Sequence, residues 1–156
     1  MKKPRLDALD LRIIRELQAD GRMTNVELAK RVGISAPPCL RRVRALEDAG
    51  VIQSYHAEVD AAQIGFTVTV FAMVGLHSQA EADLQAFETL IGSWPEVREC
   101  HMLNGDIDFI LKIVAPDLAS FQSFLTRKLT PAPNVANVKT SLTIRQSKKL
   151  AGVPVE

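Results

Sequence analysis

Apolar residues recur at helical spacing in the first part of the chain. Leu11, Ile14 and Leu17 form a stripe that predicts a helix with one buried face. Asp7 is well suited to the N-cap of this helix. Gly21 suits a left-handed residue that would end it. The pattern therefore predicts a first helix between these two residues.

The next segment predicts a second, shorter helix. Thr24 and Glu27 have the spacing of a capping box, in which each residue satisfies a backbone amide of the other. Gly33 is placed to end the helix. Its apolar face is expected to comprise Val26, Leu28, Ala29 and Val32.

A turn containing glycine then leads into a predicted third helix. Ser35 is expected to cap this helix, which would extend to Ala49 before Gly50. The residues expected to be buried are Leu40, Val43 and Leu46. Three short helices with such a turn match the helix-turn-helix plan. Residues 51–59 fit a short strand, a wing or the start of a linker.

The remaining two thirds of the chain combine strand and helix patterns. Alternating apolar positions predict strands over residues 66–76, 97–103, 108–114 and 138–144. Asn104 and Gly105 form a strong hairpin signal between the second and third strands. Amphipathic helices are predicted over residues 80–92 and 117–129. The order βαββαβ is that of the ferredoxin-like plan, a four-stranded sheet with two helices on one face.

These elements predict an α+β chain with an N-terminal winged helix-turn-helix and a C-terminal ferredoxin-like domain. The expected boundaries are residues 1–56, a linker at 57–65, the second domain at 66–147 and a tail at 148–156. Both faces of the strand at 66–76 are apolar, so the open face of the sheet needs a cover. A second copy of the chain is one candidate cover, and an overlong helix or the tail is the other.

Charge is distributed unevenly along the chain. Residues 1–56 contain 11 Lys and Arg against 7 Asp and Glu, whereas residues 57–156 contain 8 against 11. The first segment therefore carries +4 and the second −3. Such asymmetry suggests that only the N-terminal part meets a polyanion.

The third helix supplies the strongest candidates for contact with duplex DNA. In a helix-turn-helix this element enters the major groove, where arginine suits both phosphate and guanine. The alternative is a solvated arginine face on a plain three-helix core. The candidate DNA-binding residues are Lys2, Lys3, Arg5, Asn25, Lys30, Arg31, Ser35, Pro38, Cys39, Arg41, Arg42 and Arg44.

Other classes of function find little support in the sequence. Cys39 and Cys100 are far apart and lack zinc-site or disulfide-framework spacing, so we expect reduced thiols and no metal site. No nucleophile-elbow, phosphate-loop or metalloprotease motif occurs, so no catalytic residue and no cofactor are predicted. The longest apolar stretch is too short to span a bilayer, and no signal peptide is recognisable. We therefore expect a cytoplasmic protein with no membrane partner.

Two segments resemble the leucine-responsive regulator/AsnC, or feast/famine, family of transcription regulators. The first covers residues 25–35 and continues through 38–43 and 46–52, and the second covers residues 97–101 and 105–112. The resemblance extends from Leu6 to about Ser147. One departure is Pro37 beside Pro38, where many members have one proline and a small polar neighbour.

The resemblance implies a regulator whose dimers assemble into tetramers or octamers and bind a small amino acid between dimers. An amino acid needs donors for its carboxylate and acceptors for its ammonium group. The candidate effector residues are Leu103, Gly105, Asp106, Asp108 and Thr140. The alternative for residues 103–108 is a plain hairpin with solvated aspartates.

The predicted function is therefore a sequence-specific DNA-binding regulator modulated by an amino-acid effector. One alternative is an enzyme on the same scaffold, since some sirohaem decarboxylases are similar to this family and retain a degenerate helix-turn-helix. The basic residues of the third helix are present here, which argues against this alternative. The other alternative is an amino-acid sensor that does not contact DNA, and the same arginines argue against it.

Overall fold

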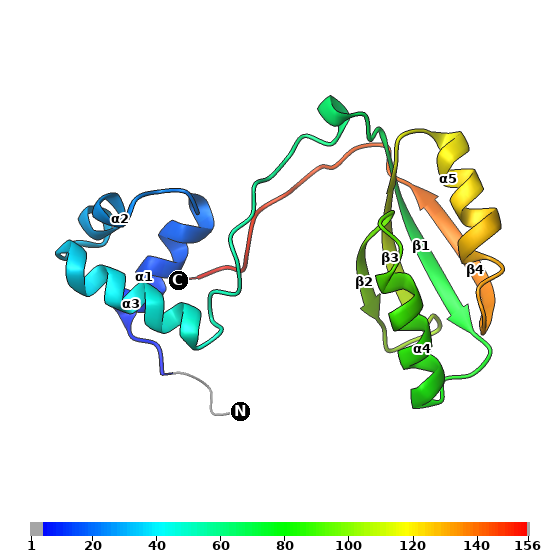
Figure 1. Ribbon diagram of the computed structural model, residues 1–156, viewed down its shortest axis with the longest axis horizontal. Coiled ribbons are helices and arrows are strands. Elements are labelled where there is room, and N and C mark those ends of the chain that lie inside the picture. The colour runs from blue at the N-terminus through cyan, green and yellow to red at the C-terminus, as the bar shows by residue number, and fades with distance from the viewer. Residues whose placement is uncertain (1–4, 156) are drawn as a thin grey trace. The chain divides into compact units, whose positions relative to one another are not determined.

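The computed structural model of the chain describes residues 5–155 and has two compact units (Figure 1). The first unit extends to Glu58 and also includes the segment from Lys148 onward, whereas the second comprises Val59–Ser147. The first is helical and the second combines helices with a sheet, so the α+β fold class is confirmed. No helix in the described range is long and apolar enough to cross a membrane.

Three helices make up the first unit, namely α1 (Ala8–Ala19), α2 (Asn25–Val32) and α3 (Ala36–Asp48). Asp7 and Asp10 form a reciprocal capping box at the start of α1. Gly33 ends α2 with φ of 78°, a left-handed conformation that glycine adopts without steric cost. The buried core comprises Ile13, Leu28, Ala29, Val32, Cys39 and Leu46.

Several local expectations for these helices are wrong. The helix α1 ends at Ala19 with Asp20 in an extended conformation, so Gly21 adopts no left-handed backbone. The Thr24 hydroxyl accepts a hydrogen bond from the backbone N–H of Glu27, but the Glu27 carboxylate pairs with Arg31 and does not complete a capping box. Val26, expected in the core, is 70% exposed.

In the predicted buried stripe of α3, Leu46 is buried and Val43 packs against the core, but Leu40 is misplaced. Cys39 is fully buried, and Leu46 lies seven residues later on the same face. Leu40 is 37% exposed, because one residue along a helix turns the side chain by about 100°. The sequence offers two adjacent apolar residues here, and the expectation that Leu40 and not Cys39 is buried is wrong.

The segment after α3 contains no strand. Residues 51–59 form no β-ladder within the described chain, so the strand alternative is wrong. The Tyr55 hydroxyl donates to the Glu47 carboxylate at 2.9 Å, which ties the start of this segment to the end of α3. Burial and this carboxylate raise the pKa of Tyr55 to about 12, so the hydroxyl stays protonated as a donor.

The second unit has the predicted βαββαβ order. Its elements are β1 (Val68–Leu76), α4 (Glu81–Gly92), β2 (Val97–Met102), β3 (Phe109–Ala115), α5 (Leu118–Phe124) with a π-helical turn at Leu125–Leu129, and β4 (Val135–Leu142). All neighbouring strands are antiparallel, in the order β2-β3-β1-β4. The ferredoxin-like prediction is confirmed, although β4 ends before Ile144, which is exposed.

Both helices of this unit pack on the same face of the sheet (Figure 1). The residues of β3 alternate strictly between buried and half-buried, so Phe109, Leu111 and Ile113 point into the core. Phe87 of α4 packs against Phe109 with ring centroids 5.0 Å apart. On the opposite face Phe71 remains 37% exposed in the middle of β1.

The C-terminal tail packs on α1. The Gln18 side-chain amide donates to the Val153 carbonyl at 3.1 Å and accepts from the Val153 backbone N–H at 2.6 Å. Gly152 beside it has φ of 69°, and a Cβ atom there would overlap the Gln18 side chain. The chain after the sheet therefore returns to the helix-turn-helix unit, whereas the sequence indicates only a separate tail at 148–156.

Replacing Gly152 by alanine is expected to release this tail. The left-handed backbone costs alanine about 1–2 kcal/mol, and the added methyl group displaces Gln18. Hydrogen exchange at the Val153 amide should become faster in Gly152→Ala. Gly92→Ala is the matched control, because no atom lies within 4 Å of the added Cβ there. Unchanged protection of Val153 in Gly152→Ala would contradict the packing described.

Candidate nucleic-acid interface and effector site

The exposed face of α3 presents two unpaired arginines. Arg41 and Arg44 lie three residues apart, so they share a face, and both side chains are exposed. Neither forms an ion pair within residues 5–155. Ser35 stands at the exposed N-cap, and its hydroxyl makes no capping hydrogen bond. These three side chains are free to bind a ligand, and their contact with DNA stays a prediction.

Arg42, predicted to contact DNA, instead forms ion pairs within the first unit. Its guanidinium lies 2.8 Å from a carboxylate oxygen of Asp7 and 2.7 Å from one of Asp10, so it is already paired. The sequence could not show this pairing, because the acidic partners lie more than thirty residues earlier. Arg42 fastens α3 to the start of α1 and so positions the exposed face of α3.

Acid is expected to weaken the ion pair between Asp7 and Arg42. The Asp10 backbone amide and the Arg42 guanidinium hold the pKa of the Asp7 carboxyl below its usual value. A lowered folded-state pKa stabilises the fold above the unfolded-state value, and this contribution is lost as pH falls through the lowered one. Between pH 7 and pH 3, the melting temperature of Asp7→Asn should therefore fall less than that of the wild type.

Asp48→Asn serves as the control for this comparison, because Asp48 makes no ion pair within the described residues. It should retain the acid sensitivity of the wild type. Equal acid sensitivity of wild type and Asp7→Asn would show that the Asp7–Arg42 pair does not contribute.

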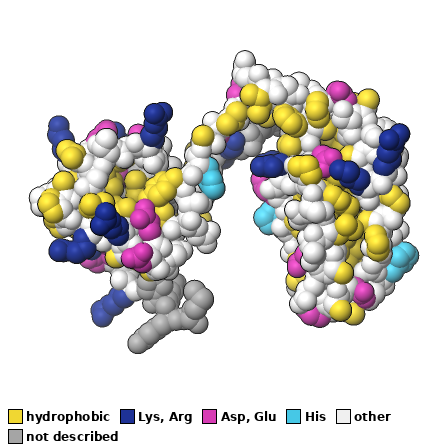
Figure 2. All heavy atoms as spheres, in the orientation of Figure 1, with side chains coloured by type: hydrophobic (Ala, Val, Ile, Leu, Met, Phe, Trp, Pro, Cys, Tyr) yellow, Lys and Arg dark blue, Asp and Glu magenta, His cyan; other side chains and the backbone are white. Residues whose placement is uncertain are grey.

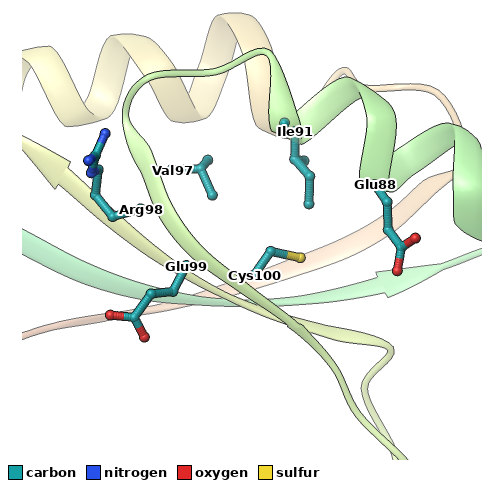
Figure 3. Close-up of a pocket in the computed structure, with 7 residues that line it drawn as sticks. Glu88, Ile91, Val97, Arg98, Glu99 and Cys100 are labelled. Carbon is teal, nitrogen blue, oxygen red and sulfur yellow. The ribbon is translucent and has the colours of Figure 1, made fainter. Parts of the chain in front are cut away.

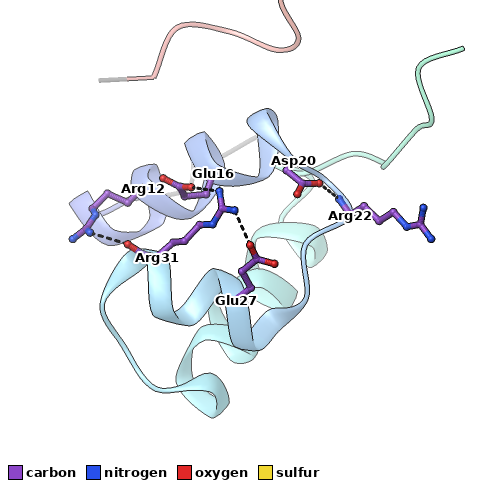
Figure 4. A network of polar contacts seen from close by, with 6 residues as sticks. All are labelled: Arg12, Glu16, Asp20, Arg22, Glu27 and Arg31. Atoms are coloured by element: carbon purple, nitrogen blue, oxygen red, sulfur yellow. Dashed lines mark hydrogen bonds and ion pairs between the residues drawn. The ribbon is translucent and has the colours of Figure 1, made fainter. Parts of the chain in front are cut away.

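Arg31 also forms ion pairs within the first unit. It pairs with Glu27 at 2.6 Å and with Glu16 at 3.4 Å, while Arg12 donates to the Arg31 carbonyl (Figure 4). These acidic partners raise the pKa of Arg31. Arg31 therefore holds α2 against α1, and its contact with DNA stays a prediction.

Three more predicted contacts have internal roles. The Asn25 side-chain amide donates to the Ala36 carbonyl at 2.8 Å, which ties α2 to the first turn of α3. Cys39 has no exposed surface, so the prediction that its side chain contacts DNA is wrong. Pro38 is half-buried beside it.

The remaining basic candidates are at the surface or outside the described residues. Lys30 and Arg5 are exposed. Lys2 and Lys3 lie outside the described residues. Figure 2 shows Lys and Arg side chains projecting from several sides of this unit, with acidic side chains between them. In this view the basic side chains therefore form no continuous surface.

In the second unit the candidate effector loop is ordered by Asp108. One Asp108 carboxylate oxygen accepts from the Leu76 backbone N–H at 2.6 Å. The Leu103 N–H donates to the Asp108 carbonyl at 2.8 Å, closing residues 103–108 into a hairpin. Gly105 and Asp106 at its tip are exposed. Asp106 is therefore free, whereas Asp108 already serves to hold the loop on β1.

Thr140 is not brought next to this loop within one chain. It pairs with Ala72 across β1 and β4, three residues along β1 from Gly75. Asn137 is the β4 residue opposite Gly75, and its side-chain amide lies over that glycine. The sequence carries no signal for Asn137, because only the strand register places it at this end of the sheet. Thr140 remains a prediction.

A separate small cavity of about 290 Å³ lies between α4 and β2 (Figure 3). Burial, together with the carboxylate of Glu88, raises the pKa of Cys100 to about 11. Cys100 is therefore a thiol at neutral pH, whereas a nucleophilic cysteine needs the thiolate. The residues lining the cavity are Glu88, Ile91, Gly92, Val97, Arg98, Glu99 and Cys100, and none of them is a predicted site residue.

A helix-turn-helix with free arginines, combined with a ferredoxin-like domain, defines a DNA-binding regulator with a separate ligand-binding domain. Family models agree with both halves. The family model for a winged helix-turn-helix DNA-binding domain matches residues 6–53. The family model for the Lrp/AsnC ligand binding domain matches residues 69–153. The chain belongs to the Lrp/AsnC family of transcription regulators, as its resemblance indicates.

Individual relatives support this assignment over nearly the whole chain. The chain is 56% identical to a leucine-responsive regulatory protein of Rhizobium meliloti over 96% of both chains. It is 41% identical to the Bkd operon transcriptional regulator of Pseudomonas aeruginosa, covering 90% of this chain and 92% of that one. A Neisseria meningitidis transcriptional regulator solved with L-Met superposes with a TM-score of 0.91 at 33% identity, covering 96% of this chain and 97% of that one.

Proposed function

We propose that the exposed face of α3 enters the major groove of duplex DNA and that Arg41 and Arg44 contact it there. The observation that carries this proposal is their lack of any internal ion partner among the described residues, in contrast to Arg31 and Arg42. A guanidinium without a carboxylate partner is free to bind phosphate or the acceptor edge of guanine. Arg42 then acts as a positioning residue that fixes the angle of α3.

The effector of the second unit is, in this proposal, a small amino acid bound at residues 103–108. The exposed Asp106 carboxylate can accept from its ammonium group, and the backbone at Gly105 can donate to its carboxylate. The N. meningitidis regulator solved with L-Met supports this class of ligand. Leu103 and Thr140 remain candidate contacts. The proposal assigns a regulatory role and no catalytic one.

We also propose that the chain self-associates through the open face of the sheet, the face opposite α4 and α5. Phe71 lies exposed there beside Lys112, its register partner on β3. A sheet face that helices leave open and that carries apolar side chains such as Phe71 can be covered by a second copy of the chain. We propose a dimer formed by this face, with dimers assembling further into tetramers or octamers.

Phe71→Lys should disrupt this dimer. It replaces an apolar contact by a charge, and that charge would lose its hydration when a second copy covers the face. Light scattering should show a shift to a smaller assembly. Leu118→Lys, at an exposed residue of α5, should leave the mass unchanged. Identical masses for wild type and Phe71→Lys would exclude this face as the interface.

DNA binding itself is tested with the full chain and its own promoter region. Fluorescence anisotropy should show saturable binding whose affinity falls as salt concentration rises, because bound arginines displace counterions from phosphate. A panel of amino acids should include one that changes this affinity or the mass of the assembly. Absence of saturable binding to any promoter fragment would overturn the proposal.

A further inference from the structure

The first two turns of α3 expose apolar side chains beside its free arginines. Pro37 is exposed, and Leu40 is 37% exposed although leucine is usually buried. The two lie three residues apart and so are neighbours on the helix surface. Arg41 and Arg44 follow Pro37 and Leu40 by four residues each, so the four side chains form one continuous surface. We call it the Pro37–Arg44 face.

Nothing within the described fold accounts for the exposure of Leu40. The core of the first unit includes Cys39 and Leu46 from α3, and Val43 packs against it, but Leu40 is not among its residues. Leu40 thus keeps more than a third of its surface open to solvent. A surface that combines two apolar side chains with two cations fits a partner that offers both apolar groups and negative charge.

Duplex DNA offers that combination in its major groove. Phosphates line the groove, and each thymine places its C5-methyl group on the groove floor as the apolar feature of the base edges. The first turns of a recognition helix are the part that reaches base edges. In α3 this part offers Ser35 as a hydrogen-bonding side chain. The side chains of Pro37 and Leu40 have no polar atoms, so they can read a base edge only by apolar contact.

We propose that Pro37 and Leu40 read thymine C5-methyl groups and thereby determine which A·T pairs the protein recognises. This inference rests on the proposed insertion of α3 into the major groove. Arg41 and Arg44 supply attraction to phosphate or guanine, whereas Pro37 and Leu40 supply discrimination at thymine. Deoxyuridine differs from thymidine only by the missing methyl group, so it removes the proposed contact and leaves base pairing intact.

The test uses the full chain and synthetic duplexes of a promoter fragment that the protein protects. Each thymine in turn is replaced by deoxyuridine, and Kd is measured by fluorescence anisotropy. At one or more positions per half-site the wild type should bind about fourfold more weakly, the effect of about 0.8 kcal/mol for one methyl-sized group. The double variant Pro37→Ala/Leu40→Ala should bind thymine and deoxyuridine duplexes equally.

Leu118→Ala removes an equally apolar side chain, exposed on α5, and should retain the fourfold discrimination. Melting curves of the variants check folding, and the uridine scan of the wild type needs no variant at all. If the wild type binds every uridine duplex as tightly as the parent, Pro37 and Leu40 do not read methyl groups, although DNA binding stands. If the wild type binds no fragment saturably, both this inference and the proposed function fail.

Discussion

The double variant Arg41→Ala/Arg44→Ala is expected to bind promoter DNA at least about thirtyfold more weakly than the wild type. Each arginine that contacts a base or phosphate contributes about 1–3 kcal/mol, and the effects of two such substitutions multiply in Kd. Both side chains are exposed and unpaired within residues 5–155, so their removal leaves the core of the first unit intact. The melting temperature should therefore remain close to that of the wild type.

Fluorescence anisotropy over a range of salt concentrations measures this effect. The slope of log K against log salt should become shallower by about 1 for each phosphate that the variant no longer neutralises. The control variant Arg127→Ala/Arg145→Ala removes two positive charges from the second unit and should change the Kd for DNA little. Full affinity in the α3 double variant would show that another surface binds DNA.

Phe109→Ala is expected to cause the largest decrease in stability, about 3–5 kcal/mol in the free energy of unfolding of the second unit. Phe109 is fully buried between the sheet and α4, where its ring packs against Phe87. Truncation leaves a cavity that neighbouring side chains cannot fill without moving the helix. Because Phe109 directly follows Asp108, the candidate effector loop should also become less ordered.

Chemical denaturation followed by far-ultraviolet circular dichroism measures this decrease. Leu118→Ala is the control, because its side chain is exposed and such substitutions change stability by no more than about 0.5 kcal/mol. A Phe109→Ala variant as stable as the control would mean that the core is packed differently from the arrangement described.

Hydrophobic spacing is enough to predict the order of elements in both units. The alternation along β1 and β3 and the turn at Gly105 place the strands within a few residues. The phase of α3 is harder to predict, since Cys39 and Leu40 are adjacent and both apolar. Only packing against α1 and α2 decides which of them is buried, and spacing along one helix does not contain that information.

The candidate site is predictable in part for a similar reason. The sequence identifies the basic helix but does not distinguish Arg31 and Arg42 from Arg41 and Arg44. Ion pairs with Asp7, Asp10 and Glu16 separate the two groups, and each depends on how the helices cross. The hydrogen bonds between the tail and Gln18 are likewise invisible in the sequence, because they join residues at opposite ends of the chain.

Genome-wide mapping of chromosomal sites occupied by the wild type and by Arg41→Ala/Arg44→Ala tests the central claim most directly. If the exposed arginines of α3 deliver sequence-specific regulation, the wild type should occupy discrete promoter regions. The variant should lose that occupancy at equal cellular abundance. A variant that occupies the same promoters as the wild type would contradict the assignment of α3 as the element that binds DNA.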